Sequence, residues 1–409
     1  MVPRSCGEVM LTPPNLPADF YTTERTLAHM HQAAEATLVS PDAMLAALLA
    51  RVAAGTPTEA TVNDAPLNYI SAIIGGSGTG KSAAVRTARR LLPNIGTDLD
   101  NLPVSSGEGL VQAYMTREDG ENRQRYTAGL FYVDEGESLL RVAGREGSTT
   151  LATLRTLWSG ESTGSTGAQA NTTRRLQADA YRFALVVGIQ PAYAMTLLAD
   201  DHAGTPQRFL WMSAGNPHAP DREPAWPGEI SLVYPSAPLH LPAAIRAEVN
   251  EERRTRLRSN GPGDPLQSHS TQLALRIAGL LAVLCGRPSE VTTEDWERGR
   301  IAVEHSRRVI QSLIDARAAE RRAEEQQQDQ HYIERRLHKK ELEHQGKIER
   351  IAEHAGRLLT EKGPMTRGRL RSLLRSTDRP HSEEAFQHAI TRGLIAAVDQ
   401  SRLGAGPLA

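Results

Sequence analysis

A glycine-rich segment has the residue types and the spacing needed to bind a chain of phosphates. It fits the pattern G-x-x-x-x-G-K-S. Glycines let consecutive backbone N–H groups face phosphate oxygens, because no side chain blocks the approach. In this pattern the lysine reaches the β- and γ-phosphates and the serine hydroxyl binds Mg²⁺. The residues of this predicted phosphate-binding loop are Gly75, Gly76, Ser77, Gly78, Thr79, Gly80, Lys81 and Ser82.

The segments on either side of the loop match what this chemistry requires. The apolar run 69–74 predicts a buried strand, and residues 82–90 predict a helix. The N-terminus of that helix would add partial positive charge beside the phosphates. A flexible glycine/serine linker that fits by accident is the alternative, and the flanking strand and helix disfavour it. We therefore expect the chain to bind a nucleoside triphosphate together with Mg²⁺.

A second apolar run ends in two acids and could complete this site. Residues 129–133 are followed directly by Asp134 and Glu135. Asp134 fits the acid that holds Mg²⁺ at a strand end, and Glu135 fits the carboxylate that polarises an attacking water. The alternative is an ordinary exposed acidic turn. The pair of acids favours an ATPase over a small-molecule kinase, because a kinase needs no water-activating acid there.

Two further residues could act on the γ-phosphate. Gln190 follows the apolar run 183–189, where its amide could orient the lytic water; it could equally be a polar residue that ends a strand. Arg208 lies beside the apolar cluster 209–211 and could be an arginine finger that enters a neighbouring subunit's site. An arginine at the surface or at the edge of the core is the alternative.

Composition limits the protein class. The formal net charge is −1, so any nucleic-acid surface must be local. Two cysteines are too few for a disulfide framework and match a reducing cytosol. The longest apolar run, 273–285, is interrupted by Arg276 and is too short to span a bilayer. These features predict a cytoplasmic protein that makes no contact with a membrane.

The chain divides by composition and periodicity into six segments. The segments differ in proline content, charge and apolar spacing. They are an N-terminal helical segment (1–66), an α/β nucleotide-binding core (67–215), a proline-rich connector with a strand-like patch at 230–234 (216–267), a helical lid (268–317), a charged linker helix (318–346) and a C-terminal domain (347–409).

The order of these motifs resembles the AAA+ module of minichromosome-maintenance-type helicases. In that resemblance Gln190, before Pro191, takes the place of the first sensor, although those helicases carry Asn. Arg208 would carry the finger, and Arg276 would be the sensor-2 arginine of the lid. The small polar segment 164–175 would be a hairpin in a central channel, with Arg174 and Arg175 gripping DNA phosphates. A surface hairpin without a ligand is the alternative, and Asp179 and Tyr181 leave the hairpin register open.

Residues 20–315 also resemble an uncharacterised family of phage and mobile-element P-loop proteins. The resemblance depends on Ser-Gly-Glu-Gly at 106–109, Leu-Arg-Thr-Leu-Trp at 154–158 and Arg-Phe-Leu-Trp at 208–211. Members of that family are regarded as helicase-like partners of primases. The resemblance therefore implies a role in the replication of a mobile element.

The C-terminal segment 347–409 resembles a winged helix-turn-helix domain, with three helices and a strand in that order. It contains 11 Lys/Arg against 7 Asp/Glu, a local net charge of +4. That excess favours DNA contact, although many winged helices dock proteins instead. The candidate DNA contacts are Arg367, Arg369, Arg371, Arg375 and Arg392.

Two other patterns do not predict sites. The G-x-S-x-G match at 160–164 lacks the preceding strand that a hydrolase nucleophile requires. Several scattered histidines lack ligand spacing with cysteines or acids, so solvated or capping roles are favoured over a metal site. They are His29, His31, His331, His338, His344 and His354.

Together these patterns predict an α/β P-loop NTPase with an AAA+/RecA-like three-layer αβα core, a helical lid and a C-terminal winged helix. The preferred hypothesis is an ATP-dependent, helicase-like DNA motor that forms a homo-oligomeric ring such as a hexamer and that partners a primase. One alternative is an ATP-gated DNA-binding switch that does not translocate. Another is a nucleotide-dependent scaffold that recruits a primase or other protein.

Overall fold

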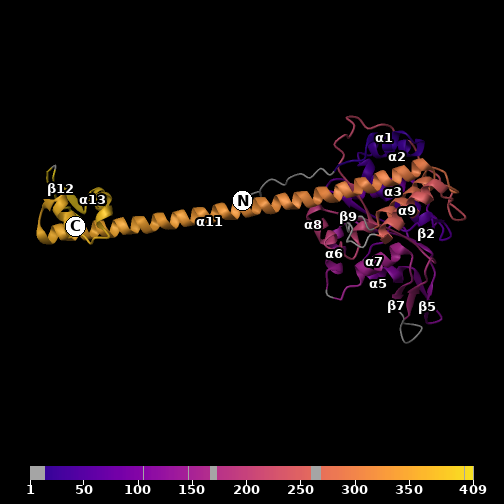
Figure 1. Ribbon diagram of the computed structural model, residues 1–409, viewed down its shortest axis with the longest axis horizontal. Helices are drawn as coiled ribbons and strands as arrows, with labels where there is room; N and C mark the ends of the chain where they lie inside the picture. The colour runs from indigo at the N-terminus through magenta and orange to yellow at the C-terminus, as the bar shows by residue number, and fades with distance from the viewer. Residues whose placement is uncertain are drawn as a thin grey trace. The chain divides into compact units, whose positions relative to one another are not determined.

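The computed structural model describes residues 14–104, 106–145, 147–165, 173–258, 269–399 and 401–408. The chain forms two compact units, Met1–Arg317 and Ala318–Ala409 (Figure 1). The expected hairpin tip, residues 166–172, and the first 13 residues lie outside the described residues.

A four-stranded parallel sheet is the centre of the first unit. Its strands lie in the order β10 (Phe209–Ser213), β3 (Tyr69–Ile74), β9 (Arg182–Ile189) and β6 (Ala128–Val133). Every residue of β3, β9 and β10 is buried, as expected of a parallel sheet that is covered on both faces. All four strands point the same way, so their carboxyl ends share one edge.

The N-terminal helices belong to the same hydrophobic core as the sheet. Helix α3 (Pro41–Gly55) contacts all four strands, and all but its last residue are buried. Its sequence is apolar almost all round, which is typical of a helix enclosed in a core. Ser40 caps α3 and donates its hydroxyl to Ser213 O at 2.7 Å. The structure thus differs from the expected division at residue 66, because residues before it cover the sheet.

The remaining elements of the first unit surround this core. Three antiparallel pairs of short strands accompany the parallel sheet. The proline-rich patch 230–234 has no strand, in contrast to its expected character. The elements are α1 (Ala18–Thr22), α2 (Arg25–Glu35), β1 (Thr61–Val62), β2 (Ala65–Pro66), α4 (Lys81–Leu91), α5 (Gly107–Ala113), β4 (Met115–Glu118), β5 (Glu121–Gln124), α6 (Gly136–Ala143), α7 (Thr150–Ser159), β7 (Thr163–Ser165), β8 (Arg174–Leu176), α8 (Pro191–Leu198) and η2 (Pro206–Arg208).

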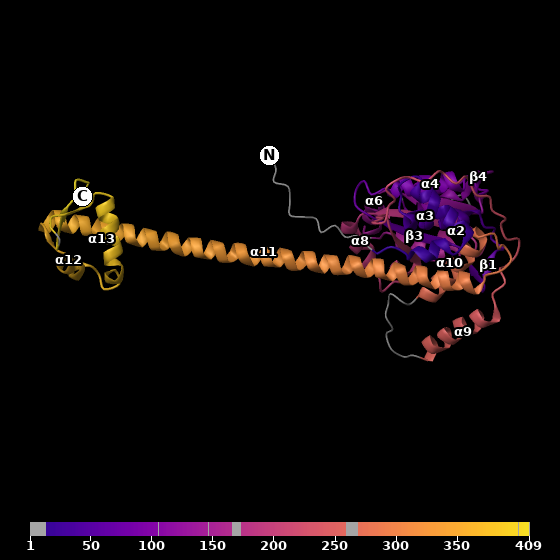
Figure 2. The same ribbon diagram turned by 90° about the horizontal axis from the view of Figure 1, so that it is seen from above.

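Helices α9, α10 and α11 come next in the sequence after the last strand of the sheet. Helix α9 (Ala243–Arg258) buries Ile245 and Val249, and Figure 2 shows it at the periphery of the first unit. Helix α10 (Ser270–Leu284) is buried along nearly its whole length and packs on α3. Helix α11 (Thr293–Lys362) contributes residues to both units. Within the described residues, no helix has both the length and the apolar character needed to cross a membrane.

The second unit has its own small core. After α11 come β11 (Met365–Thr366), α12 (Arg367–Leu373), η4 (Arg379–His381), α13 (Ser382–Thr391), β12 (Ile395–Ala397) and β13 (Arg402–Ala405). The three strands form an antiparallel sheet in the order β11-β13-β12. Residues 319–343 of α11 are exposed, whereas Ile348 and Ile351 enter the core. The helix continues through residues 346 and 347, where a segment boundary was expected.

Candidate functional site

The glycine-rich loop opens on a cavity at the carboxyl-terminal edge of the parallel sheet. The cavity has a volume of about 250 Å³. Ligands of parallel α/β sheets bind at this edge, outside the strand ends. The cavity is lined by the loop, by the end of β6 and by the end of β9. The lining residues are Ser77, Gly78, Thr79, Gly80, Lys81, Ser82, Asp134, Glu135, Gly136, Glu137, Gly188, Gln190 and Tyr193.

The backbone of the loop needs its glycines. Gly78 and Gly80 have φ of 77° and 86°, a region that L side chains rarely adopt. A Cβ on Gly75 would lie 2.3 Å from Thr79 Oγ1 and 2.7 Å from Ala214 Cβ. The first turn of α4 begins after Gly80, so its N–H groups without partners in the helix lie beside the cavity. This arrangement provides backbone donors for an anion.

Lys81 closes the loop by contacting its backbone. Its ammonium group donates hydrogen bonds to Gly75 O at 2.8 Å and to Gly76 O at 2.6 Å. Burial lowers the pKa of Lys81, and the nearby Asp134 carboxylate opposes that shift. Two carbonyl groups do not neutralise the charge, so an anion in the cavity would be a stronger partner.

The two acids lie at the end of β6. Asp134 follows the last strand residue and accepts a hydrogen bond from the Tyr132 hydroxyl at 2.5 Å. Ser82, the last residue of the loop, lines the same cavity as Asp134. Glu135 precedes α6, is exposed and makes no capping hydrogen bond with that helix. The Ser82 and Asp134 oxygens are a donor set of the kind Mg²⁺ prefers.

Gln190 lies between the loop and the acids because β9 lies between β3 and β6. In the sheet register Ile74 faces Ile189, and Val133 faces Val187. Gln190 directly follows β9, is exposed and lines the cavity. The structure therefore brings the loop, Asp134, Glu135 and Gln190 to one cavity.

Sequence reasoning missed several residues that line or support this cavity. Gly136, Glu137 and Tyr193 line it, and the Tyr132 hydroxyl donates a hydrogen bond to the Asp134 carboxylate. Gly188 allows the ends of β9 and β6 to touch: a Cβ there would lie 2.6 Å from Asp134 O. A lone glycine in a β-branched strand indicates such close approach, so Gly188 had a usable signal.

The two arginines expected at the γ-phosphate lie elsewhere in the first unit. Arg276 is 2% exposed, and its guanidinium carbon lies 3.4 Å from the centre of the Trp158 ring. Its Nε donates to Pro66 O at 2.8 Å. Burial is the main cause that lowers the pKa of Arg276 to about 9, and Arg182 adds to it. Arg276 lies on the buried helix α10, whose packing encloses the side chain, so this placement does not support contact with a nucleotide of the same chain.

Arg208 belongs to the same cluster around Trp158. Its guanidinium lies 5.4 Å from the ring centre and donates to Gly204 O at 2.5 Å. Burial lowers the pKa of Arg208 to about 10, and the charge of Arg155 contributes. Arg208 is absent from the residues that line the loop cavity. A role at the γ-phosphate would therefore have to involve the nucleotide of another subunit.

The arginines expected to bind DNA occur in two places. Arg174 and Arg175 are exposed on β8, where Arg175 pairs with Gly164 and Arg174 with Ser165. In the second unit, Arg367 forms an ion pair with Glu383 at 3.3 Å, and Arg392 pairs with Glu349.

Three other arginines of the second unit remain exposed and make no ion pair within its described residues. They are Arg369, Arg371 and Arg375, on or just after α12. In contrast, the first turn of α13 contains Glu383 and Glu384. The positive charge therefore lies along α12.

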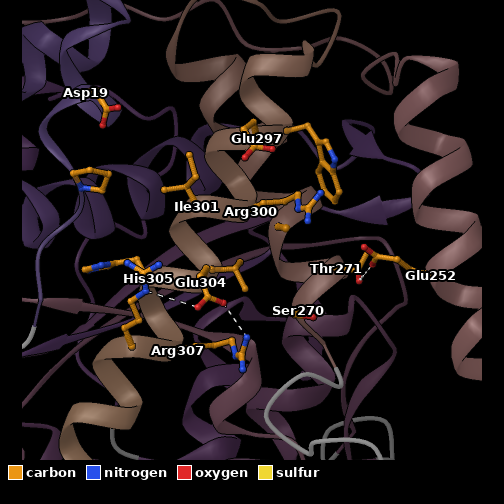
Figure 3. Close-up of a pocket in the computed structure, with 15 residues that line it drawn as sticks. Asp19, Glu252, Ser270, Thr271, Glu297, Arg300, Ile301, Glu304, His305 and Arg307 are labelled. Carbon is orange, nitrogen blue, oxygen red and sulfur yellow. Dashed lines mark hydrogen bonds and ion pairs between the residues drawn. The ribbon is translucent and has the colours of Figure 1, made fainter.

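A larger cavity of about 540 Å³ lies between α10 and α11 (Figure 3). Its charged residues largely compensate one another. Glu304 pairs with Arg307 at 2.9 Å and with Arg308 at 3.7 Å, and Arg300 pairs with Glu248 at 2.6 Å. The buried His305 at its wall lies 3.4 Å from Asp42. These pairs indicate a structural groove.

The fold resembles solved structures, whereas sequence comparisons find no match. No family model matches the chain, and no curated protein matches it. The structure is similar to that of a full-length MCM homolog from Methanopyrus kandleri, with 17% sequence identity and a TM-score of 0.39. The similarity covers 74% of this chain and 64% of that protein, so the match spans less than two thirds of its length. The function of this protein is therefore inferred from the geometry of the cavity.

Proposed function

We propose that this protein is a P-loop ATPase whose active site is the cavity at the edge of the parallel sheet. The observation that carries the proposal is the convergence of the loop, Lys81, Asp134, Glu135 and Gln190 on one space. Few other chemistries use a glycine-rich anion cradle, a lysine and two adjacent acids together.

Each residue has a defined part in hydrolysis. The loop N–H groups and Lys81 bind the phosphates and stabilise the charge that develops on them. Ser82 and Asp134 would hold Mg²⁺, which neutralises phosphate charge when it is bound. Glu135 accepts a proton from the attacking water, and the Gln190 amide orients that water. Glu135 is exposed, and its side chain makes no capping hydrogen bond to α6, so its carboxylate is available for this step.

The proposal is tested by replacing Glu135 with glutamine. Glu135→Gln keeps the shape of the side chain but removes the base, so hydrolysis should fall at least about 100-fold while nucleotide still binds. Glu118→Gln, an exposed acid at the end of β4, is the matched control and should hydrolyse ATP at the wild-type rate. The assignment would be contradicted if Glu135→Gln hydrolysed ATP as fast as wild type. It would also be contradicted if Glu135→Gln, but not Glu118→Gln, lost nucleotide binding.

We further propose that hydrolysis drives a DNA motor built from an AAA+-like core, with α10 and the start of α11 as the lid. Arg208, which lies outside its own chain's cavity, would then complete a neighbouring subunit's site in a ring. A mixture of Lys81→Ala and Arg208→Ala subunits tests this. Partial recovery of activity relative to either variant alone would support a site shared between subunits, whereas no recovery would contradict it.

The second unit supports a winged-helix assignment through its order of elements: helix, strand, two helices, two strands. Recognition helices contact bases with their N-terminal residues. The corresponding turn of α13 contains Glu383 and Glu384, which repel DNA. DNA contact would therefore involve phosphates and the arginines of α12, here Arg369 and Arg371.

This charge arrangement keeps a second candidate function open: an ATP-gated switch or scaffold that docks a protein, for example a primase, through α13. Measuring ATP hydrolysis with and without single-stranded DNA separates the candidates. Stimulation that is lost in Arg369→Ala/Arg371→Ala would support the motor. No stimulation and no strand displacement would favour the switch or scaffold.

A further inference from the structure

Two histidines and a glutamate of the second unit lie close together: His344, His381 and Glu384. His344 is far from the other two in sequence. His344 lies on α11, His381 ends η4, and Glu384 lies in the first turn of α13. One ligand atom of each side chain lies within 4.8 Å of those of the other two. We propose that these side chains bind a divalent transition-metal ion of the zinc class.

The core of the second unit holds the three backbone positions in place. Ile348, one helical turn after His344, is 4% exposed, so His344 lies on the core-facing side of α11. Ala385 and Phe386, next to Glu384, are fully buried and anchor the start of α13. The ligand side chains themselves are at least partly exposed, so they can rotate without disturbing this core.

The contacts in the structure pair His344 with Glu384 but give the His381 imidazole no polar partner among the described residues. His344 Nε2 lies 2.9 Å from Glu384 Oε2 and 3.0 Å from Oε1, which is a simple ion pair or hydrogen bond. The His381 ring packs edge-on against the His344 ring, with centroids 5.3 Å apart. Within the described part of the chain, the His381 imidazole has no hydrogen bond or ion pair. A shared metal ion would use all three side chains.

The donor set selects the class of ion. Imidazole nitrogens and one carboxylate suit Zn²⁺ and its neighbours, whereas Mg²⁺ and Ca²⁺ prefer oxygen ligands throughout. Ligand atoms around a tetrahedral zinc ion lie about 3.3 Å apart, given metal–ligand distances of about 2.0 Å. The present separations, up to 4.8 Å, need only small side-chain rotations to reach that geometry. The fourth position is left for water.

A bound ion would connect α11 to the junction between η4 and α13. Two ion pairs already join α11 to this part of the chain: Arg350 with Asp378, just before η4, and Glu349 with Arg392, just after the end of α13. The metal would add His381 to the existing contact between His344 and Glu384 and would occupy Glu384. Because the unfolded chain does not hold the three ligands together, binding would stabilise the folded second unit.

The test is a titration of zinc into full-length, untagged protein that has been treated with a chelator, in the absence of nucleotide. The heat of binding is measured by calorimetry. His381→Ala is the informative variant because it keeps the pair between His344 and Glu384. It should weaken binding by at least about tenfold. His388→Ala removes an exposed histidine from the same helix α13 and should bind zinc like wild type.

Thermal unfolding supplies the second readout. Zinc should raise the unfolding midpoint of wild type and of His388→Ala, but not that of His381→Ala. Without metal, His381→Ala should unfold like wild type; if it does not, His381→Gln replaces it in both measurements. The proposal is overturned if wild type takes up no zinc, or if the His381 variant that folds binds as tightly as wild type. Lys81→Ala should bind zinc normally, which separates this site from the nucleotide cavity.

Discussion

The loop cavity and the cluster around Trp158 both contain residues that the sequence marks as catalytic, yet they are opposite environments. In the cavity, Asp134, Glu135 and Gln190 are exposed and converge on open space. In the cluster, Arg276 is fully enclosed and stacked on an indole ring. The difference teaches that a charged residue in the right order along the chain still needs a path to the substrate.

The two regions also differ in their effect on the stability of the folded protein. The cavity is lined by backbone groups and exposed side chains, which water can hydrogen-bond when no ligand is bound. The cluster holds buried guanidinium groups whose pKa values fall to about 9 for Arg276 and about 10 for Arg208. Such groups are stabilised by backbone carbonyls and aromatic faces, as in the contacts of Arg276 with Pro66 and Trp158. The cavity should therefore control activity, and the fully buried Arg276 of the cluster should control stability.

The largest expected effect is on activity, in Lys81→Ala. Loss of the ammonium group removes the only lysine in the cavity lining, and ATP hydrolysis should fall about 1,000-fold. The midpoint of thermal unfolding should stay near that of wild type, because the Lys81 ammonium group donates its hydrogen bonds to two carbonyls of the loop, Gly75 O and Gly76 O. Lys362→Ala, which removes an exposed lysine at the end of α11, is the control. A large loss of stability in Lys81→Ala would contradict the contrast between the two regions.

Arg276→Ala should show the reverse pattern. It leaves Pro66 O without its donor and opens a cavity beside Trp158, so the free energy of unfolding should fall by about 3 kcal/mol in urea titrations. Arg253→Ala, an exposed arginine of α9, should change it by less than about 0.5 kcal/mol. Full stability of Arg276→Ala together with loss of hydrolysis would assign Arg276 to the nucleotide after all.

Local sequence signals were enough to predict the parts of the site that depend on neighbours in the chain. The loop 75–82 needs glycines at fixed spacing for its own backbone geometry, and Asp134 directly follows a strand. The parallel α/β sheet also follows from short apolar runs alternating with helices. These features are readable because the physical requirement and the residues that meet it lie within about one turn or strand.

Features that depend on packing between distant segments were not readable. Helix α3 was separated from the core, although it covers the sheet, because an apolar helix does not reveal what it packs on. The enclosure of Arg276 depends on Trp158, more than 100 residues away. His344 showed no metal-ligand spacing in the sequence for the same reason: it lies near His381 and Glu384 only because the segment 381–384 packs beside α11.

Tyr132→Phe should sharpen the description of the cavity with a moderate effect. The Tyr132 hydroxyl donates to Asp134 and so orients the carboxylate proposed to hold Mg²⁺. Its removal should raise the Mg²⁺ concentration needed for half-maximal hydrolysis by about tenfold, the usual cost of losing such a supporting group. The rate at saturating Mg²⁺ should change much less. Tyr126→Phe is the control, and an unchanged Mg²⁺ requirement in Tyr132→Phe would contradict this role.

The smallest effect concerns the cluster and pH. Burial is the main cause that lowers the pKa of His269 to about 4, and the charge of Arg208 adds to it. In the unfolded chain the pKa would be about 6.5, so the unfolded state takes up a proton that the folded state refuses until about pH 4. Stability contributed by this group is therefore lost as pH falls from about 6.5 towards 4.

His269→Gln should flatten this dependence. Thermal unfolding midpoints measured between about pH 7 and pH 5 should fall less steeply in the variant than in wild type. His388→Gln, which changes an exposed histidine, should keep the wild-type slope. Parallel curves for all three proteins would mean that His269 accepts its proton in the folded state. That result would contradict a His269 pKa that burial and the neighbouring arginines of the Trp158 cluster hold below its usual value.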